Sequence, residues 1–311
     1  SDHIMYLACL DGKAAGRIMG IINNRCNEYR HEKNARFGYL ECRDNQDIAH
    51  LLLSSVERWA EERGMSKLVG PMGFYNQDSA GFLIEGFQHN HTINTYFNHR
   101  FINDLLEKEG YSKEVDYVVY KIDLKKEMPA LYSGIYDRII SRGEYVLEKF
   151  AKRKHIKPFI MPILELMNEC FAELYGFYPL DNEEMRLLAG RFLPILDPRF
   201  VKVVTKDNKV VAFNIAMPNL SDGLIKAKGK LLPFGIFAIK ASARNSRQLD
   251  SLIGGISKEF WGRGLDVMMV YSTLLAAQEA GFIYADSHHE LEDNTRVRAE
   301  MERLGGEVYK R

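Results

Sequence analysis

The 311-residue sequence has no paired cysteines, no long apolar run and no excess of either charge. Its four cysteines show no C-x-x-C spacing and no histidine pairing that would suggest zinc; they are Cys9, Cys26, Cys42 and Cys170. No stretch approaches the roughly 20 apolar residues that span a bilayer, and no signal-peptide layout stands at the N-terminus. We therefore expect free thiols in a reducing compartment, no metal site and a cytoplasmic protein.

The charges balance over the whole chain. Lysine plus arginine and aspartate plus glutamate each number 42, so no net field gathers phosphate backbones or an anionic membrane surface. The short basic run at residues 152–154 is typical of a solvated cluster. We expect no nucleic-acid partner and no membrane partner, and the sequence leaves the oligomeric state open.

What the sequence does contain is enough apolar residues for two cores. Hydrophobic residues make up 46% of the chain, and a prior of roughly 150 residues per domain favours two domains. Two series of strands and helices follow one another. We predict a first unit at residues 1–124, a connecting helix or linker at 125–144 and a second unit at 145–311, in a mixed α/β fold.

Hydrophobic periodicity and turn residues predict the elements of each unit. In the first unit, strands are expected at residues 5–10, 16–22, 36–42, 67–70 and 115–122, with helices at 47–63 and 100–109. In the second, Asp181 and Glu184 stand at capping-box spacing before a helix, and Asp207-Asn208 predicts a hairpin turn. The second unit is completed by five further predicted elements: a strand ending at Ile256, a helix to Ala280, a strand at 282–288, a helix at 294–304 and a strand from Val308.

The stretch EFWGRGLD, residues 259–266, lies between that strand and the helix that ends at Ala280. A helix N-terminus offers unpaired N–H groups and the positive end of the helix dipole to an anion. Gly262 and Gly264 remove Cβ atoms where the backbone would approach a phosphate, and Arg263 adds a positive charge. A glycine that serves only to turn the chain is the alternative interpretation of this spacing.

With these flanking elements, residues 145–311 resemble the GNAT superfamily of acyl-CoA N-acyltransferases. The family's pyrophosphate loop reads Q/R-x-x-G-x-G/A, and here Glu259 stands at its first position. The resemblance extends to NTRVRAEMERLGG, in which Asn294 matches an asparagine that contacts CoA and Gly305 a closing glycine. Met301 stands where many relatives have a tyrosine that protonates the departing thiolate. A thioether has no proton to give, so either another group or water replaces the tyrosine, or acyl transfer is slow or absent.

The first unit resembles a second, degenerate GNAT-type copy, which makes the fold a tandem one. Its corresponding loop, CRDNQD, has no glycine, and Asp44 and Asp47 lie where the helix is expected to begin. Carboxylates there would repel a pyrophosphate, so this unit is not expected to bind CoA in the usual way. The glycine- and aromatic-rich segment at 70–87 either walls an acceptor site or is a folded surface loop. The family pattern also leads us to expect that the chain is clipped at both ends.

The resemblance implies an acyl-CoA site and a catalytic pair. Acetyl-CoA or another acyl-CoA is the expected cofactor, and the residues expected to bind it are Gly255, Ile256, Ser257, Trp261, Gly262, Arg263, Gly264 and Asn294. Paired glycines at 254–255 would permit a bulge that frees an N–H group. Asp286, His288 and Glu290 would share one strand face if the strand reaches that far, and Glu292 precedes the asparagine expected to contact CoA. Of these, His288 and Glu292 are the expected catalytic residues. Solvated charges at a strand end are the alternative.

The resulting functional prediction is an N-acyltransferase that moves an acyl group from CoA to a small-molecule amine. Two alternatives stay open at this point: a peptidyltransferase-like protein that uses aminoacyl-tRNA, and a non-catalytic binding protein with the GNAT fold. A pronounced basic groove would favour the first alternative, and the balanced charge argues against it. The second is supported by Met301 and by the glycine-free loop of the first unit.

Overall fold

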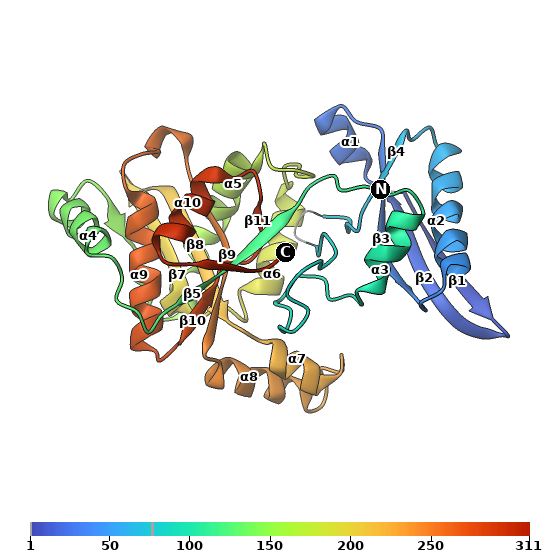
Figure 1. Ribbon diagram of the computed structural model, residues 1–311. Helices are drawn as coiled ribbons and strands as arrows, with labels where there is room; N and C mark the ends of the chain where they lie inside the picture. Colours follow the sequence, from blue (N-terminus) through green and yellow to red (C-terminus); the bar gives the residue numbers. More distant parts are fainter. Residues whose placement is uncertain (1, 76–77) are drawn as a thin grey trace. The chain divides into compact units, whose positions relative to one another are not determined.

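The computed structural model describes residues 2–75 and 78–311, which form two compact units (Figure 1). Unit 1 contains the chain up to Val118, together with Tyr175–Tyr178 and Lys310–Arg311. Unit 2 contains Val119–Leu174 and Pro179–Tyr309. The predicted boundaries at residues 124 and 145 stay predictions.

Unit 1 is built on a four-stranded sheet in the order β1-β2-β3-β4. Its strands are β1 (Asp2–Leu10), β2 (Lys13–Ile22), β3 (Asn34–Cys42) and β4 (Lys67–Val69), and its helices are α1 (Asn24–Arg30), α2 (Gln46–Glu61) and α3 (Phe101–Lys108). The apolar face of α2 packs on the sheet through side chains that include Leu52, Val56 and Trp59. Asn45, and neither of the two neighbouring aspartates, caps α2 by accepting from the N–H of Ile48.

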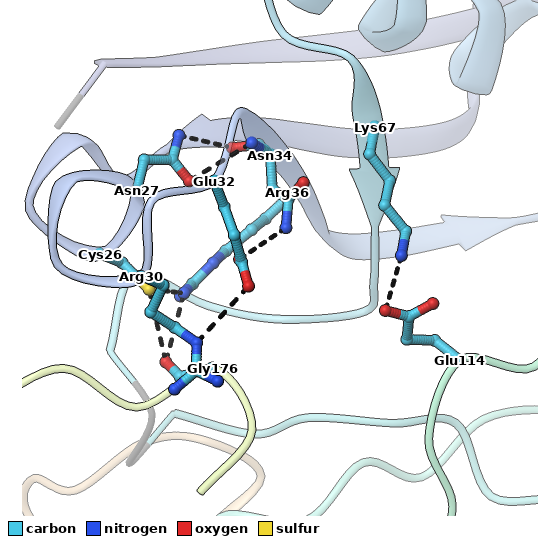
Figure 2. A network of polar contacts seen from close by, with 9 residues as sticks. All are labelled: Cys26, Asn27, Arg30, Glu32, Asn34, Arg36, Lys67, Glu114 and Gly176. Carbon is cyan, nitrogen blue, oxygen red and sulfur yellow. Dashed lines mark hydrogen bonds and ion pairs between the residues drawn. The ribbon is translucent and has the colours of Figure 1, made fainter. Parts of the chain in front are cut away.

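A buried guanidinium organises the interior of unit 1 (Figure 2). Arg36 is 4% exposed and donates to the carbonyls of Gly73 and Gly176 and to the sulfur of Cys26. Because carbonyl oxygens satisfy this charge, Gly176 and its neighbours are fixed as part of the unit's core. Phe177 and Tyr178 are buried there as well. Of the segment at 70–87, residues 76 and 77 lie outside the described part of the chain.

Unit 2 carries the larger, mixed sheet, in the order β11-β5-β10-β9-β8-β7-β6 with β12 also paired to β5. Its strands are β5 (Tyr117–Asp123), β6 (Val146–Leu147), β7 (Val201–Lys206), β8 (Lys209–Pro218), β9 (Gln248–Ile256), β10 (Tyr284–Asp286), β11 (Glu290–Leu291) and β12 (Glu307–Lys310). The β9–β10 pair is parallel, whereas the β5–β10 and β8–β9 pairs are antiparallel. The predicted α/β class is therefore confirmed.

Unit 2 has seven α-helices among its described residues. They are α4 (Ala130–Arg142), α5 (Ile160–Phe171), α6 (Asn182–Phe192), α7 (Ser221–Ala227), α8 (Gly235–Asn245), α9 (Leu265–Glu279) and α10 (Thr295–Arg303). The capping box of Asp181 and Glu184 and the hairpin turn at Asp207-Asn208 are confirmed. Within the described ranges, no helix combines the length and apolar character needed to cross a bilayer.

Unit 2 departs from the sequence-based prediction in two places. Between the turn at Asp207-Asn208 and β9, where no helix was predicted, α7 and α8 form a helical hairpin. The strand expected at 282–288 is only Tyr284–Asp286, because His288 adopts a left-handed conformation (φ 61°) that turns the chain out of the sheet.

Candidate functional site

One edge of β9 is open over most of its length. β8 pairs with β9 from Leu249 to Ile256, whereas β10 pairs with it only at Gln248–Asp250. Beyond Asp250 no other strand of the described chain continues the sheet on the β10 side. Strand alternation gives Gly254 the same orientation as Ile256, with its N–H and C=O directed to that open edge. An extended ligand with amide groups can hydrogen-bond to such an edge.

The end of this edge is closed by protein groups. The indole Nε1 of Trp261 donates to the carbonyl of Ile256 at 2.9 Å. Ser257 uses its N–H on the carbonyl of Val211 and its hydroxyl on Glu169 at 2.8 Å. Gly255 faces α5, where an added Cβ would lie 2.9 Å from the sulfur of Cys170. The predicted bulge is misplaced: Gly254 and Gly255 keep a regular register with β8, and the irregularity falls between Ser251 and Ile253.

The glycine loop leads directly into α9. Gly262 (φ 72°) and Gly264 (φ 79°) both have left-handed backbones, and Gly264 is the N-cap of the helix, which has no side-chain cap. Among the described residues, the N–H groups of Gly262, Arg263 and Gly264 donate no hydrogen bond. Free amides at the positive end of a helix dipole form a site for an anion.

A pocket of about 410 Å³ lies in front of these amides. Its lining residues are Ile135, Arg138, Ile139, Arg142, Glu144, Tyr145, Gly262, Arg263 and Gly264. Arg138 and Arg142 stand one turn apart on α4, so three guanidiniums and one carboxylate share the pocket. The sequence analysis missed the two α4 arginines, although their i, i+4 spacing placed them on one helix face.

Trp261 and Asn294 connect the loop with α10. The guanidinium carbon of Arg296 lies 4.6 Å from the centre of the Trp261 ring, a cation–π contact. Asn294 caps α10 by accepting from the N–H of Val297. Its observed contact is therefore structural, and contact with CoA stays a prediction. Glu259 is exposed in the short turn before Trp261.

Two buried aspartates lie where β9 and β10 part. Asp250 and Asp286 are directly in register on these parallel strands and are 1% and 0% exposed. Asp250 accepts from Asn219 at 2.8 Å and from Gln248 at 2.7 Å. The sequence analysis overlooked Asp250, whose only signal was a carboxylate inside an otherwise apolar strand.

Asp286 accepts from the N–H of His288 at 2.6 Å and from the hydroxyl of Tyr309. Burial and the Asp286 carboxylate raise the pKa of Tyr309. Burial, with Asp250 and Asp286 nearby, also raises the pKa of Tyr284, whose hydroxyl donates to Gln248. Both tyrosines are therefore neutral donors near pH 7, tied to this carboxylate network.

The predicted catalytic residues follow β10 without sharing a strand. β11, which contains Glu290, lies on the far side of β5 from β10. The expectation that Asp286, His288 and Glu290 share one strand face is therefore wrong, because the left-handed His288 ends the strand. The imidazole of His288 lies 5.1 Å from that of His289, and the carbonyl of Glu292 accepts from Arg298 at 2.7 Å.

A cluster of acidic groups forms beneath this segment. Burial, with Glu300 nearby, raises the pKa of Glu290 to about 8. Burial, with Asp266 nearby, raises the pKa of Glu300 to about 7. Tyr132 on α4 belongs to the same neighbourhood: burial and the Glu300 charge raise its pKa to about 12. The Tyr132 hydroxyl is buried and has no hydrogen-bond partner within the described chain.

Met301, at the position of the family tyrosine, packs into the core formed by residues such as Phe282 and Ala285. Tyr271, another tyrosine of unit 2, lies against the ring of Tyr136, with 5.2 Å between ring centres. Among the described residues, no contact puts a tyrosine side chain at the position of Met301.

Comparison with known proteins supports this description of the fold. No family model matches the sequence. The chain is 24% identical over 315 residues to a protein of Caulobacter vibrioides named bacterial ceramide synthase, covering 98% of this chain and 81% of that protein.

Two solved structures show the same fold over nearly the whole chain. A GCN5-related N-acetyltransferase from Sphaerobacter thermophilus has a TM-score of 0.51 and 14% identity, covering 96% of this chain and 75% of that one. A tandem GNAT protein from the clavulanic acid biosynthesis pathway has a TM-score of 0.51 and 12% identity, covering 99% and 80%. The chain therefore has a tandem GNAT-like fold, as the sequence predicted.

Proposed function

We propose that unit 2 binds an acyl-CoA thioester and transfers its acyl group to an amine. The observation that carries the proposal is the succession of three features along one stretch of chain. The open edge of β9 at Gly254 is followed, past the closed end at Ile256, by three amides that donate no hydrogen bond within the described chain, and the residues that contain these amides line a pocket with three arginines. An extended amide-containing arm that ends in a pyrophosphate has the chemistry to match these features.

The residues present fit such a donor. The Gly254 peptide offers a donor and an acceptor on the open edge, and Gly262 leaves open space where a Cβ would stand. Arg138, Arg142 and Arg263 supply charge-assisted hydrogen bonds to phosphate oxygens. The carbonyl of Ile256 already accepts from Trp261, and the hydroxyl of Ser257 already donates to Glu169. The predicted contacts of these two residues with CoA are therefore restricted to their other groups.

For the acceptor, we propose a long-chain amino alcohol. The similarity to a protein named ceramide synthase extends over 98% of this chain, which supports this class. Ceramides are amides formed on the amino group of such a base. A small polar amine is the alternative class of acceptor.

The acceptor amine must lose its proton to attack, because a primary amine has a pKa near 10. We propose that His288 and Glu292 take up this proton. Asp286 positions His288 through its backbone N–H. Asp250, next to it across the parallel pair, places a second buried carboxyl group beside Asp286. A thiolate is already a fair leaving group near neutral pH, so Met301 is compatible with turnover.

Thiol release measured with acetyl-CoA and long-chain acyl-CoA, with and without a long-chain amino alcohol, tests the proposal. We expect release that depends on the amine and amide formation confirmed by mass spectrometry. His288→Ala and Glu292→Gln should each lower kcat by at least tenfold, because general acid–base catalysis contributes roughly 100- to 10,000-fold to a rate. Glu165→Gln, a carboxylate on α5 outside the site, is the control.

Release that needs no amine, or equal rates in the His288 variant and the control, would contradict the assignment of the catalytic pair. Amide formation from aminoacyl-tRNA, with no turnover of any CoA thioester, would favour the alternative donor. Absence of both activities with CoA still bound would favour a binding protein.

A further inference from the structure

The helical hairpin between β8 and β9 displays its largest apolar side chains to solvent. Leu232, Phe234 and Phe237 are 76%, 78% and 69% exposed, and Leu231 and Ile225 are 56% and 52% exposed. All five belong to α7, α8 or the turn that joins them. In Figure 1 this hairpin extends away from the sheet of unit 2.

The two helices pack against each other through small residues. Gly223 on α7 lies so close to α8 that an added Cβ would stand 2.6 Å from the Cα of Ile239 and 2.8 Å from the Cβ of Ser242. Gly235 and Ser221 are buried, while the leucine and phenylalanine side chains face outward. This arrangement is the reverse of an ordinary amphipathic hairpin, which buries its large side chains. A contiguous exposed apolar patch of this kind marks an interaction surface.

Exposed basic side chains accompany the apolar ones along the hairpin. From Ser221 to Asn245 the hairpin has five basic residues and one acidic residue, Asp222, although the whole chain is neutral. The basic residues are Lys226, Lys228, Lys230, Lys240 and Arg244, all exposed. Lysines at the border of exposed aromatic and aliphatic side chains match the headgroup region of a bilayer that contains anionic lipids.

We propose that the α7–α8 hairpin docks on an anionic membrane surface, with Leu232, Phe234 and Phe237 inserted between lipid headgroups and the lysines bound to phosphates. The positive charge of the hairpin favours an anionic membrane over a second copy of this chain. A second copy of the same surface would bring five basic residues against five, which costs free energy. The prediction of no membrane partner rested on the charge of the whole chain, whereas a membrane surface acts only within a Debye length of the bound segment.

The position of the hairpin suits this role. It enters β9 at Gln248, whereas the glycine loop leaves β9 at Ile256, so the two lie at opposite ends of one strand. A docked hairpin therefore leaves the glycine loop and its pocket at the strand end away from the bilayer. The docking is independent of the proposed acyl transfer, and either one can fail alone.

Flotation of the full chain with vesicles tests the docking. We compare phosphatidylcholine vesicles with vesicles that also contain phosphatidylglycerol, at low and high salt. We expect binding to the anionic vesicles that falls as salt rises, and at least tenfold weaker binding for the triple variant Leu232→Ser/Phe234→Ser/Phe237→Ser. A matched variant, Leu131→Ser/Leu187→Ser, removes side chains that are 62% and 59% exposed elsewhere in unit 2 and should bind as the parent does.

Because the substituted side chains are exposed, the melting temperature of each variant should stay close to that of the parent. An unchanged melting temperature shows that the fold of the variant is intact. A charge variant, Lys226→Gln/Lys228→Gln/Lys230→Gln, should bind more weakly and with a smaller salt dependence, because Lys240 and Arg244 remain. No binding to anionic vesicles, or equal binding by the triple variant, overturns the proposal. A dimer in light scattering that the triple variant dissociates would assign the surface to self-association instead and also overturns it.

Discussion

At the scale of single residues, the two loop glycines differ in what surrounds them. An alanine Cβ at position 264 would lie 3.0 Å from Ile139 and 3.1 Å from Ile135, whereas at position 262 it would meet open space. Both positions have left-handed φ values, and such a conformation costs an alanine about 1–2 kcal/mol. We predict that Gly264→Ala lowers the free energy of unfolding by more than Gly262→Ala does. Urea titration measures both; an equal loss would show that the two isoleucines adjust.

The acidic cluster predicts how stability depends on pH. The pKa values of Glu290 and Glu300 are raised to about 8 and about 7 from an ordinary 4.5, so the folded state holds protons that the unfolded state has lost. Below pH 4.5 both states hold these protons and the free energy of unfolding is at its full value. It falls as the pH rises from 4.5 toward 8, where the unfolded chain has lost the protons and the folded chain retains them. We predict a melting temperature that falls between pH 6 and pH 8.5, and a smaller fall in Glu290→Gln. An identical fall in the parent and the variant would contradict this.

The sequence predicted part of the lining of the candidate pocket where one local feature was sufficient. Gly262, Arg263 and Gly264 could be found because a strand, two glycines and a helix stand in immediate succession. Arg138, Arg142 and Asp250 could not, because their role depends on which helix packs beside the loop and which strand pairs beside β9. Those pairings are long-range contacts that no local pattern carries.

At the scale of elements, Asn294 tests whether a cap and a ligand contact coincide. Its side chain accepts from the N–H of Val297 at the start of α10, and replacing such a cap by alanine costs about 1 kcal/mol. We predict that Asn294→Ala lowers stability by this amount and that Asn294→Asp, also a good cap, restores it. If Asn294 also contacts CoA, both variants will bind CoA more weakly. The alanine removes the contact, and the aspartate repels the negatively charged ligand.

The elements themselves were predicted well where their pattern was amphipathic and poorly where it was not. α2 and the β7–β8 hairpin carried clear periodicity and turn residues, and both are confirmed. α8 was missed because its apolar residues do not face a core, so the usual helical pattern is absent. β10 was predicted too long because a left-handed histidine is rare and has no sequence signature.

At the scale of the whole molecule, the tandem GNAT-like fold followed from the order of elements and one loop motif. Two segments belong to compact units other than the ones their place in the chain order suggests. β5 joins the sheet of unit 2 beside β10, and Tyr175–Tyr178 belong to unit 1, although the chain order assigns each to the other half. Segments that leave one unit to complete the other are decided by sheet edges and buried charges such as Arg36, which appear only in the folded chain.

Calorimetric titration of the full chain with CoA, in the parent and in two glutamate variants, tests the central claim most directly. Gly262 and Gly281 both have a left-handed backbone and open space around the missing Cβ, but only Gly262 lines the pocket. We predict that the parent and Gly281→Glu bind one CoA per chain with similar affinity, while Gly262→Glu binds at least tenfold more weakly. Equal affinity in all three proteins, or no binding by the parent, would contradict an acyl-CoA site at the N-terminus of α9.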